Sequence, residues 1–189
     1  MRILIFLFVF VSPVMACLGQ KKEIPRDRKG QPIGEYQWVR SISAQLKLEP
    51  VEYGYDSLQL RIWLGHSLAI EKHLVVITRQ QGKWKGRLFT LRVKWNATND
   101  TQRVVSRTVR EIHPSMGWDK LMGQLLRLDI TTLPNGPDGG MDGMEYAVEV
   151  AVKDSYRFYR YWSPDTTPKD KGSGKMIDIV RLLKKQAAF

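Results

Sequence analysis

The histidines of this sequence are few, and their spacing does not suit a metal site. The chain contains His66, His73 and His113, and its single cysteine is Cys17. No two histidines have the short spacing that places two ligands on one face of a helix, and no cysteine lies near them. We therefore predict no metal ligands and no cofactor.

A cluster of acidic residues occurs in a glycine-rich segment. Asp138, Asp142 and Glu145 lie close together there, and carboxylates with backbone carbonyls are the ligands that Ca²⁺ prefers. Their spacing differs from the Asp-x-Asp-x-Asp-Gly loop, and Asp-Gly is also common in tight turns before strands. We interpret the segment as a turn.

No set of catalytic residues can be recognised from motifs. There is no Gly-x-Ser-x-Gly sequence, and the Gly-Lys pairs within residues 82–84 and 172–175 lack the rest of a phosphate-binding loop. A pair of carboxylates for glycoside hydrolysis stays open, because such a pair is defined by its separation in space. We predict no catalytic residue by name.

Aromatic and basic side chains form the one candidate ligand surface. Trp63 shares a strand face with Arg61. Tyr159 and Tyr161 share another strand face with Arg157. If exposed, these faces would suit stacking on sugar rings or docking of an anionic partner. The alternative is that the rings lie beneath helices.

A β-hairpin over residues 144–152 and 156–163 is the expected centre of the fold. Tyr146 and every second residue after it are apolar, whereas Glu149 and Lys153 fall on the other face. This alternation predicts a first strand with one dry face and one wet face. The second strand has aromatic residues on both faces, which indicates a central strand covered on both sides.

Other strands precede this hairpin. They are predicted at residues 36–48, 58–64, 74–80, 84–95 and 103–112. Apolar residues within 36–48 fit both helical spacing and alternation, and we predict a strand that ends at Pro50. A turn at residues 81–82 precedes the 84–95 strand, whose Arg92 and Lys94 face water.

Two helices complete the predicted fold. Ser115 caps the first, whose apolar face holds Trp118, Leu121, Met122, Leu125 and Leu126. Ser173 caps the second, over residues 172–187. We predict an α+β domain in which a mostly antiparallel sheet has two helices packed on one face. The predicted core contains Leu121, Leu125, Tyr146, Val148, Val150, Val180 and Leu183.

The first sixteen residues have the three parts of a secretory signal peptide. Arg2 precedes an unbroken apolar run over residues 3–11, and the small residue Ala16 marks the cleavage site. The apolar run is shorter than the about 20 residues needed to span a bilayer. We therefore expect export, with residues 1–16 removed.

The residues at the cleavage site resemble a known motif. Residues 14–17, Val-Met-Ala-Cys, resemble the lipobox of bacterial lipoproteins. The resemblance implies that Cys17 becomes a lipid-modified N-terminus carrying a diacylglycerol. Cleavage after Gly19 by an ordinary signal peptidase is the alternative. We expect a lipid-anchored basic tether over residues 17–34 and a single α+β domain over residues 35–189.

The mature chain is strongly basic. The formal net charge is +11, and removal of residues 1–16 takes away only Arg2, which leaves about +10. Basic proteins attract nucleic acid, anionic lipid and acidic polysaccharide. Because we expect export, we exclude nucleic acid and retain anionic lipid, glycan or an envelope protein as partners.

These expectations favour a binding role at the cell envelope. The chain resembles the small envelope lipoproteins of Gram-negative bacteria, which implies a membrane anchor and a location facing the periplasm or the cell surface. We expect a lipid-anchored, non-enzymatic binding or interaction module. The alternative is a secreted hydrolase of envelope or polysaccharide substrate, with a site assembled only in space.

Overall fold

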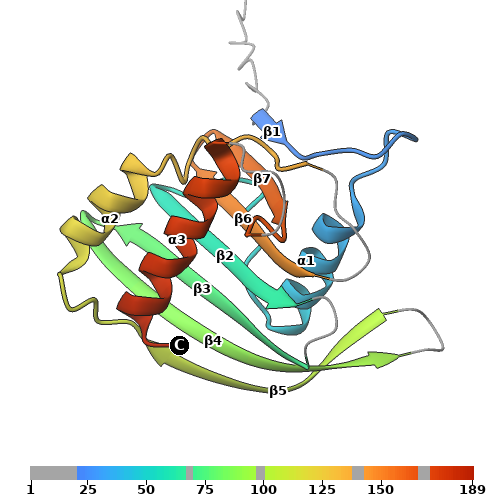
Figure 1. The fold of residues 1–189 in the computed structure, drawn as a ribbon, viewed down its shortest axis with the longest axis horizontal. Coiled ribbons are helices and arrows are strands. Elements are labelled where there is room, and N and C mark those ends of the chain that lie inside the picture. The colour runs from blue at the N-terminus through green and yellow to red at the C-terminus, as the bar shows by residue number, and fades with distance from the viewer. Residues whose placement is uncertain (1–20, 67–69, 97–100, 138–142, 166–170) are drawn as a thin grey trace, which may run out of the picture.

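The structure is a computed structural model that describes residues 21–66, 70–96, 101–137, 143–165 and 171–189. Strands and helices alternate irregularly along the chain (Figure 1). The elements are β1 (Lys21–Glu23), α1 (Gly34–Gln45), β2 (Leu58–His66), β3 (Glu71–Gln80), β4 (Lys83–Asn96), β5 (Thr101–Glu111), α2 (Trp118–Arg127), β6 (Met144–Val152), β7 (Ser155–Trp162) and α3 (Lys171–Ala187).

The strands form one mixed sheet. Its order, over the described residues, is β1-β7-β6-β2-β3-β4-β5. Neighbouring strands pair antiparallel except β1 and β7, which run parallel. The predicted α+β class is confirmed, and the parallel pair at one edge makes the sheet mixed.

Helices cover both faces of the sheet, which corrects the expected arrangement of two helices on one face. α2 and α3 bury Leu125 and Val180 against Val148 and its neighbours on one face. α1, a third helix within the described residues, buries Val39 and Ile42 on the opposite face. Figure 1 shows α3 in front of the sheet and α1 behind it.

The segment predicted as a strand over residues 36–48 is mostly helical, so that prediction was wrong. Val39, Ile42, Ser43 and Leu46 are buried at intervals of three and one residues that define one helical face. Ile42 and Leu46 fit a period of two as well, which is why alternation was misleading.

The hairpin predicted at the centre is confirmed as β6 and β7, but its first strand has no wet face. Glu149 is only 1% exposed, because α1 covers the face on which it lies. In β7, Phe158 lies in the core beneath α1, whereas Tyr159 and Tyr161 lie in the core beneath α2 and α3. β7 is therefore covered on both sides, as predicted.

The seven predicted core residues are all buried. Leu126 is an exception to the predicted apolar face of α2, since it is 47% exposed. Gly117, not Ser115, occupies the N-cap of α2. The hydroxyl of Ser115 instead donates to Gln186 Oε1 at 3.0 Å and joins the start of α2 to α3. Ser173 lies buried within α3 rather than at its cap.

The segment from Lys21 to Gly34, expected as part of a tether, contributes contacts to the domain. β1 pairs with β7, and Ile24 and Ile33 pack against the core beneath α1. The remainder of the expected tether, Cys17 and the expected signal peptide lie outside the described residues. None of the described helices is both long and apolar enough to cross a membrane.

Candidate functional site: a basic groove beside α1

The five residues expected to form a ligand surface do not lie on one exposed face. Trp63 is 1% exposed and lies beneath α1, and Arg61 is 3% exposed on the same face of the sheet. Tyr159 and Tyr161 are also buried, on the opposite face of the sheet. The structure therefore separates these aromatic rings into two cores.

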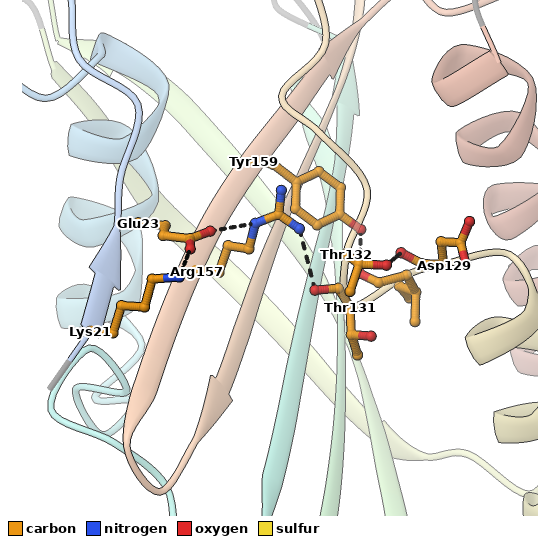
Figure 2. Close-up of polar contacts among 8 residues, drawn as sticks. Lys21, Glu23, Asp129, Thr131, Thr132, Arg157 and Tyr159 are labelled. Carbon is orange, nitrogen blue, oxygen red and sulfur yellow. Dashed lines mark hydrogen bonds and ion pairs between the residues drawn. The ribbon is translucent and has the colours of Figure 1, made fainter.

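Arg157 connects two segments of the fold (Figure 2). Its Nε lies 2.9 Å from Glu23 Oε2 in β1, and its Nη1 donates to the carbonyl of Thr131 at 3.3 Å. The hydroxyl of Tyr159 donates to the carbonyl of Ile130 at 2.6 Å, and burial raises the pKa of this phenol. Arg157 and Tyr159 thus hold β1 and the segment after α2 against β7.

A polar network is buried beneath α1. Glu149 accepts hydrogen bonds from Trp63 Nε1 at 2.9 Å and from the Tyr156 hydroxyl at 3.0 Å. Arg61 lies opposite Glu149 in the pairing of β2 and β6. Burial raises the pKa of Glu149, whereas Arg61 and the two hydrogen bonds oppose the rise. Through these contacts, Glu149 has hydrogen-bond partners on the face of β6 that points toward α1.

A second polar cluster lies near the first turn of α1. Arg160 Nε is 3.0 Å from Glu35 Oε1. Burial raises the pKa of Glu145 to about 7, and Glu35 adds to the rise, whereas Arg160 and Lys72 oppose it. Burial lowers the pKa of Lys72, whose Nζ lies 5.1 Å from the centre of the Trp38 ring.

A groove of about 780 Å³ lies beside α1 on the same face of the sheet. α1 crosses this face from β7, where the Tyr36 and Phe158 rings are 5.4 Å apart, to β5, where Gln45 donates to the carbonyl of Gln102. The groove lies over the parts of β2, β3, β4 and β5 that the helix leaves uncovered. Its rim includes the residues that follow α1 and Trp118 at the start of α2.

Cationic side chains predominate in the groove. Five of them line it: Lys47, Arg61, Lys85, Arg87 and Arg107. The carboxylates in its lining are Glu49 and Glu111. Lys85 and Arg87 reach the groove together because alternate residues of β4 project to the same side of the sheet. This arrangement can attract an anion through several charges at once.

Gly86 allows Trp118 to pack closely against β4, on the face of the sheet opposite α1. A Cβ atom at Gly86 would collide with Cη2 of Trp118 and would also touch the side chain of Ile112. The absence of a side chain therefore lets Trp118 lie directly against β4, where both residues border the groove.

Arg61 is the only member of the expected ligand surface that also lines the groove. Its Nε donates to Gln59 Oε1 at 2.8 Å and its Nη2 to the carbonyl of Glu49 at 2.6 Å, and burial lowers its pKa. Sequence reasoning missed Lys85 and Arg87, although the pattern held a signal. Lys85 and Arg87 precede Phe89 on one face of β4. Where the side chains along a strand face change from basic to apolar, the change indicates the boundary of the area that a helix covers.

The described residues contain no group of three histidine, cysteine or acidic side chains that could hold a metal ion. Asp138 and Asp142, considered above with Glu145, lie outside the described residues. The chain matches no protein-family model, and no curated protein is similar to it in sequence.

Proposed function

We propose that the protein is a lipid-anchored, non-enzymatic binding module of the cell envelope that holds an anionic ligand in the basic groove. The observation that carries this proposal is the set of five cationic side chains around one groove that contains only two carboxylates. Its volume, about 780 Å³, is within the range of about 300–1,000 Å³ typical of ligand sites.

The way Arg107 is held supports binding of an anion. Its Nη1 donates to the carbonyl of Leu46 at 2.9 Å. A neutral carbonyl fixes the guanidinium in place but does not cancel its charge, so the cation is oriented in advance for a ligand.

The placement of the perturbed carboxylates favours binding over catalysis. A hydrolase that assembles its site in space would need a carboxyl group with a raised pKa beside its substrate. Glu145 and Glu149 have raised pKa values, but neither lines the groove. Among the residues that the structure describes, the two carboxyl groups with a raised pKa named here therefore lie away from the place where a ligand would fit.

Binding of an anionic probe across a salt series tests this proposal. We would measure binding of the mature chain, with Cys17→Ser, to an acidic oligosaccharide, an acidic peptide and anionic vesicles. Charge-driven binding should weaken as salt rises, because screening acts over about 8 Å at physiological ionic strength. The double variant Lys85→Glu with Arg87→Glu should weaken binding by at least about tenfold.

A matched control carries the same charge change on α2. Lys120→Glu with Arg127→Glu alters two exposed residues outside the groove and should weaken binding by less than about threefold. Equal loss in both double variants would show that net charge alone attracts the ligand and would remove the groove from the proposal. No binding of any anion at low salt would contradict the proposal entirely.

A further inference from the structure

β5 forms one edge of the sheet, and it borders the groove. It is the last strand in the sheet order, so within the described residues no strand pairs with its outer side. Arg107, Val109 and Glu111 of β5 line the groove. The edge and the groove therefore belong to one continuous surface.

The hydrogen-bond pattern shows which backbone groups of β5 point outward. The amide of Ile112 donates to the carbonyl of Gly86 at 2.9 Å, so this pair is bonded across β4 and β5. Bonded and non-bonded pairs alternate along an antiparallel ladder. The backbone N–H and C=O groups of Arg107, Val109 and Glu111 consequently point away from β4, toward the open edge.

α1 closes the earlier part of the same edge. Gln45 Oε1 accepts from the backbone N–H of Val104 at 2.8 Å, and Gln45 Nε2 donates to the carbonyl of Gln102 at 3.0 Å. One side chain thus takes the place of a pairing strand at residues 102–104. The register shift between Arg92 and Val93 separates this closed part from the open part at residues 107–111.

The open part of β5 is basic and partly apolar. Arg107 and Arg110 are both held by backbone carbonyls, those of Leu46 and Ala188, at 2.9 and 2.8 Å. Val109 is 46% exposed. The adjoining groove adds Lys85 and Arg87 to Arg107, so an acidic strand laid along this edge would be attracted.

We infer that the open part of β5 binds an extended acidic segment of a partner protein as an additional strand. Backbone hydrogen bonds to Arg107, Val109 and Glu111 supply the pairing, and alternate acidic side chains of the segment reach the cations of the groove. This inference rests on the proposed function, because it names the ligand class of the same groove.

The test uses an acidic peptide of about six residues, a usual strand length, in which valine and glutamate alternate and both ends are blocked. We would measure its binding to the mature chain with Cys17→Ser by calorimetry, and map it by amide chemical shifts. Because only alternate peptide amides face β5, N-methylation of one alternate set should weaken binding by about tenfold or more, and methylation of the other set should change it little.

Two variants of the chain test the same edge from the other side. Val109→Pro removes an N–H that faces away from β4, a substitution that edge strands tolerate, and should weaken peptide binding by about tenfold. Val109→Ala keeps the N–H and should weaken it by less than about threefold. Thermal unfolding of both variants checks that the fold is retained, and the peptide series needs no variant at all.

The outcomes separate this inference from the proposed function. Two results would overturn binding of the peptide as an additional strand and leave the anion groove in place. One is equal peptide binding with either set of N-methyl groups, and the other is binding of the acidic oligosaccharide but not of the peptide. Dimerisation that depends on Val109 would instead identify a second copy as the occupant and would also overturn it. Failure of the peptide, oligosaccharide and vesicles together would overturn both proposals.

Discussion

The surroundings of the Glu145 carboxyl group change the pH at which it is protonated. Its Oε1 atom is enclosed and makes no hydrogen bond to any described residue. Burial is the main cause of the rise of its pKa to about 7 from the ordinary 4.5. A carboxyl group in this position takes up a proton when the protein folds at mildly acidic pH.

This proton uptake predicts a pH dependence of stability. Because the pKa is higher in the folded chain, the unfolded chain releases its proton first, and the unfolding free energy falls as pH rises from about 4.5 to about 7. The fall should be roughly 3 kcal/mol and should level off above this window. Urea unfolding of Glu145→Gln should lack this component.

Glu111→Gln is the control, because it removes an exposed glutamate of β5. It should keep the wild-type slope of unfolding free energy against pH. If the slope of Glu145→Gln equalled that of wild type from pH 4 to 8, the raised pKa of Glu145 would be disproved.

The sequence could not reveal this environment. Asp138, Asp142 and Glu145 are close along the chain and indicated a turn. The groups that act on Glu145 are Glu35 from α1, Lys72 from β3 and Arg160 from β7, which are distant in sequence. Pairing of the strands and packing of α1 on the sheet bring them together, so spacing along the chain carries no signal of this environment.

Two adjacent leucines of α2 test how the helix packs. Leu125 is 0% exposed in the core, whereas Leu126 is 47% exposed. Leu125→Ala should lower the unfolding free energy by about 3 kcal/mol, through lost burial and the cavity left behind. Leu126→Ala should change it by less than about 0.5 kcal/mol. Equal losses in chemical denaturation would contradict this orientation of α2.

The sequence predicted an element correctly where its apolar residues fit only helical spacing or only alternation. It failed for α1, whose apolar residues fit both. β2, β6 and α3 follow a single pattern, and their predicted ranges are close to the observed ones. α1 was missed because Ile42 and Leu46 satisfy both periods. The choice between helix and strand depends on the sheet face that holds Glu149 and Arg61, because a helix is needed to cover it. A local pattern within residues 36–48 does not contain that information.

At the scale of the whole molecule, the N-terminal motif predicts a membrane anchor. Cys17 should carry a diacylglycerol, so intact-mass measurement of the native protein should show a lipid on the N-terminal residue. Cys17→Ser should move the protein from the membrane fraction to the soluble fraction. A soluble wild-type chain that begins after Gly19 would contradict this prediction.

The groove also belongs to this scale, and sequence reasoning reached only one of its cations. Arg61 was selected for its place beside Trp63, not for a groove. Lys47 follows α1, while Arg87 and Arg107 come from two neighbouring strands. These cations share one groove because α1 leaves this part of the sheet uncovered. The sequence pattern did not identify α1 as a helix, so it could not indicate the groove.

The parallel pairing of β1 with β7 has a mechanical consequence. Tension applied to the chain before Lys21 reaches the domain first through three residue pairs and the ion pair of Glu23 with Arg157. A pull along the strand loads these contacts together, whereas a pull away from the edge breaks them one after another. Their release, followed by opening of the turn in which Arg26 pairs with Pro32, would lengthen the connection by up to about 40 Å before α1 bears the force.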